Sequence, residues 1–185
     1  MAATLEREVK LRFDNRDIAR AVIVTAGARP ARGRRLQDDR LLDTPDNRLQ
    51  QQGSVLRVRT EAGESLLTFK GPVQPSVMKL REEIETAVGD GTLILRILDA
   101  LGFQVWFRYQ KYREEFTFED VMIAVDETPV GTYMEIEGGE AGIASMTAAL
   151  DRKPSDYILQ SYRGLFVQYC QEHRVVRQHM LFETE

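Results

Sequence analysis

The sequence has one cysteine, a small net charge and no long apolar run, and each of these absences excludes a class of protein. Cys170 cannot form an internal disulfide, so a reducing compartment fits the chain and a cytoplasmic location is expected. A net charge of −4 does not supply the basic face of a general nucleic-acid binder. No stretch approaches the roughly 18 apolar residues that a membrane span requires. We therefore expect neither a nucleic-acid nor a membrane partner, while a homodimer is compatible with the sequence.

The length and composition predict one folded domain. A chain of 185 residues can bury one substantial core and is short for two. Hydrophobic residues make up 43% and charged residues 29%, which is typical of a globular rather than a disordered chain. No change in composition and no low-complexity linker divides the sequence. We expect a single domain over residues 1–185, with a core at about 4–172 and a loosely attached tail at 174–185.

The most regular feature is an alternation of apolar residues with charged ones. In the first segment Glu6, Glu8 and Lys10 share one face of a strand, because successive side chains point to opposite faces. Val9 and Leu11 lie on the other face. Later segments repeat the arrangement with Arg57 and Arg59, Lys70, Arg81, Glu83 and Glu85, Lys111 and Arg113, Asp126, and Glu135 and Glu137. If the apolar faces pack beneath helices, these charges converge on one another.

Periodicity and turn residues predict a mostly antiparallel α+β protein. The expected strands cover about 5–13, 34–43, 55–59, 65–70, 80–86, 105–118, 121–127 and 132–138. The expected helices cover about 16–27, 92–101, 143–150 and 156–172. About eight strands can close into a barrel whose interior holds one small ligand. We therefore expect a closed antiparallel barrel with a charged interior and flanking helices.

Two carboxylate pairs are candidate metal ligands. Glu6 and Glu8 share one strand face, and Glu135 and Glu137 share another. Mg²⁺ and similar cations prefer oxygen ligands, commonly protein carboxylates together with substrate phosphates and water. Either pair alone is more typical of a solvated strand face, but the recurrence of charge over several strands favours a site.

The cations on the same faces predict an anionic ligand. Guanidinium groups bind phosphate oxygens in a bidentate manner and lysine acts as a point charge. Arg57, Arg59, Lys70, Lys111 and Arg113 could together hold several phosphates. The alternative is a set of internal salt bridges, which is costly because desolvation of many ions is seldom fully repaid. Trp106 is expected to pack in the fold rather than to stack on a base.

In the order of its motifs the chain resembles the CYTH superfamily, also called the triphosphate tunnel metalloenzymes. That superfamily includes class IV adenylyl cyclases, thiamine triphosphatases and inorganic tripolyphosphatases. The motifs that carry the resemblance are Glu6-Arg7-Glu8-Val9-Lys10, Asp43-Thr44-Pro45, Leu56-Arg57-Val58-Arg59, Thr68-Phe69-Lys70-Gly71-Pro72, Arg81-Glu82-Glu83-Ile84-Glu85, Lys111-Tyr112-Arg113, Val125-Asp126, Gly131-Thr132-Tyr133-Met134-Glu135-Ile136-Glu137-Gly138 and Ser161-Tyr162.

The resemblance implies a tunnel with an acidic metal-binding side and a basic triphosphate-binding side. The implied ligands of Mg²⁺ or Mn²⁺ are Glu6, Glu8, Glu83, Asp126, Glu135 and Glu137. The implied triphosphate ligands are Lys10, Arg57, Arg59, Lys70, Lys111 and Arg113. Catalytic roles are implied for Lys111, Glu8 and Glu137.

The expected activity is metal-dependent chemistry on the triphosphate of an inorganic, nucleoside or organic compound such as tripolyphosphate, ATP or thiamine triphosphate. Attack by water would make the enzyme a triphosphatase, and attack by a ribose hydroxyl on the α-phosphorus would make it an adenylyl cyclase. Leu41 and Leu42 stand where the family often has an aromatic pair, which removes one contact for a base and favours hydrolysis. A non-catalytic polyphosphate- or nucleotide-binding module is the alternative from another class.

Overall fold

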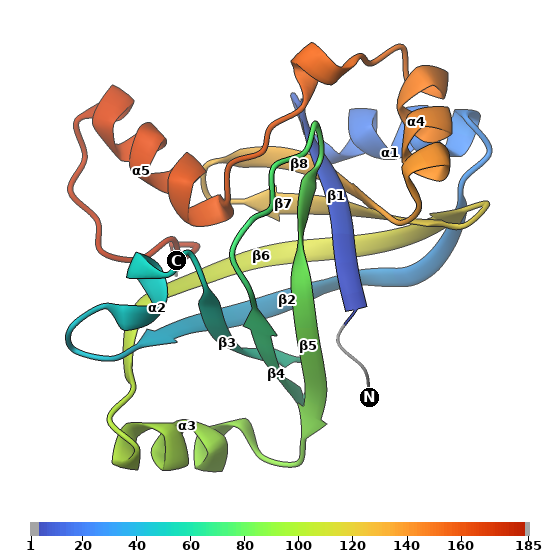
Figure 1. The fold of residues 1–185 in the computed structure, drawn as a ribbon. Coiled ribbons are helices and arrows are strands. Elements are labelled where there is room, and N and C mark those ends of the chain that lie inside the picture. The colour runs from blue at the N-terminus through green and yellow to red at the C-terminus, as the bar shows by residue number, and fades with distance from the viewer. Residues whose placement is uncertain (1–3, 184–185) are drawn as a thin grey trace.

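Eight antiparallel strands close into a barrel in the computed structural model, which describes residues 4–183 (Figure 1). The strands are β1 (Thr4–Phe13), β2 (Arg29–Asp43), β3 (Val55–Glu61), β4 (Glu64–Lys70), β5 (Lys79–Val88), β6 (Gln104–Phe118), β7 (Val121–Thr128) and β8 (Gly131–Glu137). Their order around the barrel is β1-β5-β4-β3-β2-β6-β7-β8, and antiparallel pairing of β8 with β1 completes the circle. The predicted α+β fold with a closed barrel is thus confirmed.

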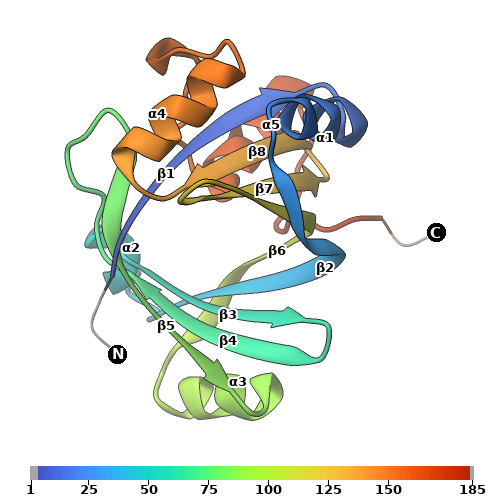
Figure 2. The ribbon, with the colours of Figure 1, turned by 90° about the vertical axis from the view of Figure 1, so that its right-hand side faces the viewer.

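Five α-helices and a short 3₁₀ helix surround the strands. They are α1 (Arg16–Thr25), α2 (Arg48–Gln51), α3 (Gly91–Ala100), α4 (Glu140–Ala149), α5 (Tyr162–His173) and the 3₁₀ helix Pro154–Asp156. Figure 2 shows α1 and α4 on the β1, β7 and β8 side of the barrel and α3 beneath β3, β4 and β5. No helix in residues 4–183 is long and apolar enough to cross a membrane.

The helix ends follow from local side chains. Asn15 caps α1 by accepting a hydrogen bond from the Ile18 amide, and Asp90 caps α3 by accepting from the amides of Thr92 and Leu93. Gly27 and Gly102 follow the two helices with φ angles of +98° and +91°. This left-handed backbone conformation favours glycine, so both helices end near the predicted residues.

The apolar core lies outside the barrel, between the strands and the helices. On one side Val9 and Ile136 from the strands pack against Ile23 of α1, and all three are buried. On another side Val58 of β3 packs against Leu98 of α3. Burying each such side chain contributes about 1.5–3 kcal/mol. Because the helices cover the apolar strand faces, the alternating charged side chains face the interior, as the sequence predicted.

The last predicted helix begins later than expected. Residues 157–161 are not helical, and the Ile158 amide donates to the Lys10 carbonyl at 2.8 Å, which joins this segment to β1. Ser161 then caps α5 by accepting from the Gly164 amide. The helix predicted at 156–172 is therefore wrong over its first turn and a half, because pairing with β1 holds that stretch extended.

The C-terminal segment is attached to β6 through its main chain. The Met180 amide donates to the Arg108 carbonyl at 3.1 Å, and the Gln110 amide donates to the Met180 carbonyl at 2.9 Å. The Met180 side chain is fully buried beside Tyr109 and Phe107. The expectation of a loosely attached tail is therefore wrong at Met180, because apolar burial and strand pairing both hold it.

Candidate active site

The barrel interior is a charged cavity of about 430 Å³. The described residues that line it carry ten cationic side chains and eight carboxylates. Every site residue predicted from the sequence lies in this lining except Asp126. Asp126 is completely buried behind the wall. The predicted site residues therefore line one cavity, and Asp126 is the exception.

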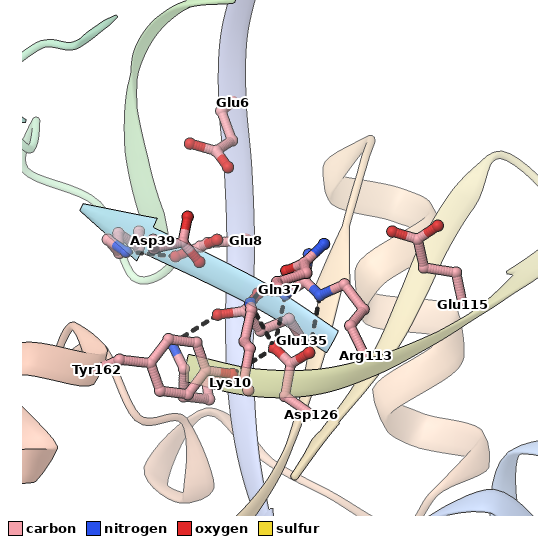
Figure 3. A network of polar contacts seen from close by, with 12 residues as sticks. Glu6, Glu8, Lys10, Gln37, Asp39, Arg113, Glu115, Asp126, Glu135 and Tyr162 are labelled. Atoms are coloured by element: carbon pink, nitrogen blue, oxygen red, sulfur yellow. Dashed lines mark hydrogen bonds and ion pairs between the residues drawn. The ribbon is translucent and has the colours of Figure 1, made fainter. Parts of the chain in front are cut away.

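Asp126 and Glu135 lie among the cations of β1 and β6. Lys111 Nζ contacts Asp126 Oδ2 at 2.8 Å, and Arg113 Nε donates to Asp126 Oδ1 at 2.7 Å. Lys10 Nζ lies 2.9 Å from Glu135 Oε1, and Arg113 also contacts Glu135. Figure 3 shows Lys10, Arg113, Asp126 and Glu135 gathered close together beside β1. Two of the six predicted metal ligands are thus held on the basic side of the tunnel.

Tyr162 holds this cluster from the C-terminal helix. Its hydroxyl donates to Asp126 Oδ2 at 2.5 Å, and its ring lies 4.6 Å from Lys10 Nζ and 4.7 Å from Lys111 Nζ. A lysine ammonium at that distance from an aromatic ring is attracted to it. Figure 3 shows the Tyr162 ring pointing from the α5 side toward Lys10. The helix therefore fixes the position of both lysines.

Burial and neighbouring charges shift the pKa values in this cluster. Burial, reinforced by the Arg113 guanidinium, lowers the pKa of Lys111 to about 8. Burial alone would raise the pKa of Asp126, but Arg113 and Lys111 outweigh it and lower that pKa to about 2. In the same way Lys10 and Lys111 outweigh burial and hold the pKa of Glu135 well below its ordinary value. Both carboxylates are therefore charged at neutral pH.

Asp39 on β2 is a further buried carboxylate that the sequence analysis missed. It is completely buried, and it accepts from Arg59 Nε at 2.9 Å and lies 3.4 Å from Arg57 Nε. Burial raises its pKa, but Arg59 and Arg57 outweigh that effect and lower it. Gln37 and Asp39 continue the same alternation as the predicted residues, so strand periodicity in β2 also indicates Asp39.

The opposite wall carries carboxylates that contact lysines. Lys70 Nζ contacts Glu6 Oε2 and Glu83 Oε2, each at 2.7 Å. Lys79, another interior residue that the sequence analysis missed, contacts Glu8. Burial lowers the pKa of Lys79 although Glu8 opposes the shift. Lys79 precedes Arg81 and Glu83 at a spacing of two, so strand alternation could have identified it.

Glu137 is the carboxylate of this wall that has no cation of its own. Its carboxylate makes no hydrogen bond or ion pair within the described residues. Partial burial and the nearby charges of Glu6 and Glu8 raise its pKa to about 7, and Glu83 adds to the effect. A carboxylate crowded by three others is stabilised in its charged form by a cation.

The donor set on this wall fits a hard divalent cation. Glu6, Glu8, Glu83 and Glu137 supply carboxylate oxygens, which are the ligands that Mg²⁺ and Mn²⁺ prefer. Within residues 4–183 no three acidic, histidine or cysteine side chains already stand together as ligands. The contacts of Glu6 with Lys70 and of Glu8 with Lys79 explain this, because each carboxylate points at a lysine.

Three guanidinium nitrogens of residues that line the cavity are buried without a hydrogen bond, and one of them, Arg35 Nη2, lies 2.8 Å from Glu115. The Nε atoms of Arg57 and Arg81 are buried without a hydrogen bond. Their nearest carboxylate oxygens lie at 3.4 Å on Asp39 and 3.7 Å on Glu6. A buried donor without a hydrogen bond costs free energy.

A closed barrel with a basic and an acidic wall around one cavity defines a tunnel protein for a polyanion. The CYTH domain model matches residues 4–153, and the chain therefore belongs to the CYTH family. Members of this family act on triphosphates and depend on divalent metal ions. The predicted family membership is confirmed.

Individual relatives match most of the chain, one in sequence and two in structure. A candidate adenylate cyclase of Methanocaldococcus jannaschii is 28% identical over 134 residues, which cover 72% of this chain and 76% of that protein. The structure of a candidate adenylate cyclase from Vibrio parahaemolyticus superposes with a TM-score of 0.75 at 21% identity, covering 90% of this chain and 99% of that one. A Hippeastrum protein, described as a candidate adenylyl cyclase with a dominant triphosphatase activity, superposes with a TM-score of 0.65 at 15% identity over 90% and 96% of the two chains.

Proposed function

We propose that this protein is a metal-dependent enzyme that hydrolyses a triphosphate inside the barrel. The observation that carries the proposal is the division of one cavity into a wall of phosphate-binding cations and a wall with the crowded carboxylate Glu137. A module that only binds anions gains nothing from carboxylates beside its ligand, whereas a metal-dependent enzyme needs them.

The basic wall would bind the phosphate oxygens. Arg57 and Arg59 reach the cavity from β3, Lys111 and Arg113 reach it from β6, and Lys10 reaches it from β1. Arginine forks position a phosphate and lysines neutralise its charge, and such positioning supplies most of the catalysis in phosphoryl transfer. Lys111, with a pKa of about 8, is largely protonated at neutral pH and would stabilise charge on the reacting phosphate.

The acidic wall would hold the metal ion and prepare water. Glu6, Glu8, Glu83 and Glu137 are the proposed ligands, and a bound divalent ion would neutralise phosphate charge as a Lewis acid. Glu137 has a pKa of about 7 in the metal-free protein, and a bound cation would lower that pKa, so Glu137 would be ionised and could accept a hydrogen bond from the attacking water. Glu8 is the neighbouring carboxylate that would help orient that water. Asp126 and Glu135, which the resemblance placed among the ligands, would instead position the lysines and Arg113.

Cyclisation of ATP is the second candidate function. The M. jannaschii and V. parahaemolyticus relatives are named as candidate adenylate cyclases, and both reactions would use the same tunnel. The Hippeastrum protein, with its described triphosphatase activity, supports hydrolysis as a reaction of this fold. The two reactions differ in the attacking oxygen and in the phosphorus that it attacks.

Product analysis distinguishes the candidates. Purified protein is incubated separately with ATP and with tripolyphosphate, in Mg²⁺, in Mn²⁺ and in excess chelator, and the products are separated by ion exchange. We expect orthophosphate that appears only with metal and is lost in Glu137→Gln. Cyclic AMP with pyrophosphate would overturn hydrolysis in favour of the cyclase. Binding of both compounds with no product under any condition would leave the non-catalytic module as the function.

A further inference from the structure

A groove of about 510 Å³ lies outside the barrel, between α5 and the segment that follows it, and we call it the α5 groove. One side comes from α5 and the other from residues 174–178, and Trp106 of β6 also lines it. Figure 1 shows the chain turning back below α5 after the helix ends. None of the described residues that line the α5 groove also lines the tunnel cavity. The groove is therefore a space separate from the proposed triphosphate site.

The apolar surface of the α5 groove includes two aromatic rings. Trp106 packs against Phe107, with ring centres 5.9 Å apart, and remains half-buried. Phe166 and Val175 line the groove beside it. Binding sites for small molecules commonly have volumes of about 300–1,000 Å³, an apolar wall and a few polar groups that fix the orientation of the ligand. The α5 groove has the size and the surface to receive an aromatic ring.

Arg163 is held against these rings with its donors unused. Its guanidinium lies 5.5 Å from the ring centre of Trp106 and 5.2 Å from that of Phe107. Contact with a ring face holds a guanidinium in place without using its N–H groups. Within residues 4–183 the Arg163 side chain makes no hydrogen bond or ion pair. Its N–H groups are therefore positioned to bind an anion at the edge of the groove.

The charge of the α5 groove favours an anion as well. Arg163, Arg174 and Arg177 line it, and no acidic side chain does so among the described residues, although the whole chain has a net charge of −4. Arg177 contacts Glu183 at 2.6 Å, whereas the Arg174 side chain makes no hydrogen bond or ion pair within residues 4–183. Two cations of the groove thus lack a negative partner.

We propose that the α5 groove binds a small aromatic anion, whose ring lies on Trp106 and whose carboxylate or similar acidic group pairs with Arg163. Arg174 adds attraction for the same group. A neutral ring would leave both arginines unpaired, and an inorganic anion would leave the apolar surface exposed to water. The site takes a molecule other than the ligand of the tunnel, so this inference does not depend on the proposed hydrolysis.

Naphthoate is the probe, because it joins an aromatic ring to one carboxylate. Its neutral amide, naphthamide, keeps the shape, and acetate keeps only the charge. The chain contains one tryptophan, so NMR shows a single indole N–H signal. With tripolyphosphate and Mg²⁺ in excess, we expect naphthoate to shift this signal to saturation and acetate to leave it unchanged. Loss of the charge-assisted hydrogen bonds should make naphthamide bind about tenfold more weakly or worse.

Substitution of an arginine tests the anion contact. Arg163→Gln should weaken naphthoate about tenfold or more and leave naphthamide within about twofold. Arg152→Gln is the matched control, because the Arg152 guanidinium also contacts a ring, that of Phe13 at 5.4 Å, but lies outside the groove. The control should change neither affinity.

Val176 tests the location of the ligand without disturbing the fold, because its side chain is fully exposed. Trp106 and Arg163 also line a neighbouring cavity of about 350 Å³, whereas Val176 lines the α5 groove alone. Val176→Glu should weaken naphthoate several-fold by repulsion between like charges, and Val176→Lys should bind it at least as tightly as wild type.

Three results would each overturn the inference. The first is the absence of a saturable shift with naphthoate up to about 10 mM. The second is equal affinity for naphthoate and naphthamide, because the arginines would then contribute nothing. The third is an equal effect of Val176→Glu and Val176→Lys, because the anion would then bind elsewhere. All three leave the product analysis of the tunnel untouched, so failure of this inference is distinguishable from failure of the proposed function.

Discussion

Replacement of Asp126 by asparagine tests whether the buried charges of the tunnel are held as the structure indicates. Asp126 is fully buried and accepts from Lys111, Arg113 and Tyr162. Asparagine keeps the shape but removes the negative charge, so it leaves two buried cations short of a partner. Truncating one member of a buried ion pair typically costs about 3–5 kcal/mol.

The pKa of Asp126 gives a second estimate of the free energy of unfolding that the Asp126 charge contributes. That pKa falls from an ordinary 3.8 to about 2. Each unit by which folding lowers a carboxyl pKa corresponds to about 1.4 kcal/mol, so the linkage alone gives about 2–3 kcal/mol. A lowered carboxyl pKa stabilises the fold above pH 3.8, and this stabilisation is lost as the pH falls toward 2. We therefore expect Asp126→Asn to cost about 2–5 kcal/mol at pH 7, with the difference shrinking below pH 4.

Urea unfolding of the metal-free protein between pH 3 and pH 7 measures this difference. Asp99→Asn on the exposed face of α3 is the control for loss of one negative charge, and a change within about 0.5 kcal/mol is expected there. A cost below about 1 kcal/mol at pH 7 for Asp126→Asn, or a cost that stays constant down to pH 3, would refute the reasoning, because the buried charge would then contribute little.

Three further substitutions each test one feature. The pKa of Glu137 is about 7 in the folded protein and 4.5 ordinarily, so this residue destabilises the metal-free fold as the pH rises from 4.5 to 7. In chelator, Glu137→Gln should therefore have a higher melting temperature than wild type at pH 8 and the same melting temperature at pH 4. Addition of Mg²⁺ should raise the melting temperature of Glu137→Gln less than that of wild type. Lys111 loses its charge above about pH 8, so calorimetry should show tripolyphosphate binding weaken from pH 7 to pH 9 in wild type and stay flatter in Lys111→Arg. Met180→Ala should cost about 2–5 kcal/mol in urea unfolding, and a change near zero would mean that the C-terminal segment does not stabilise the barrel.

Strand alternation was enough to predict most of the side chains that share the tunnel. Glu6, Glu8 and Lys10 face inward together because strand geometry leaves a residue only two directions. The same rule would have added Asp39 and Lys79. It fails to show which inward residues pair, since pairing depends on the register between strands distant in sequence. The contact of Lys70 with Glu6, 64 residues away, is of that kind.

Register also explains why the predicted metal set divides in two. Glu135 and Glu137 alternate on β8 and share one face, but residues two apart along a strand lie about 7 Å apart. Glu135 pairs across the sheet with Lys10, whereas Glu137 pairs with Glu8. One carboxylate therefore meets a cation and the other meets a second acid. The sequence alone could place both in the tunnel without distinguishing these two environments.

The late start of α5 has a comparable cause. Residues 156–172 contain enough apolar positions to predict a continuous helix, but the chain first pairs at Ile158 with β1. That pairing brings Tyr162 to the first turn of the helix and beneath the tunnel lysines. The late start of α5 thus lets Tyr162 reach Asp126. Helical periodicity in the sequence carries no information about this contact.

The ion pairs of the tunnel suggest how its two walls would act on each other. Lys70 holds Glu6 and Lys79 holds Glu8, so the cations that could bind phosphate now occupy the carboxylates that could bind metal. A triphosphate that takes these lysines would release both carboxylates beside Glu137, and the freed charges would favour a divalent ion. Such coupling is reciprocal, because a metal ion that takes Glu6 and Glu8 would free the lysines for phosphate. The buried pairs contribute little net stability on their own, and we expect them to couple the binding of phosphate to the binding of metal.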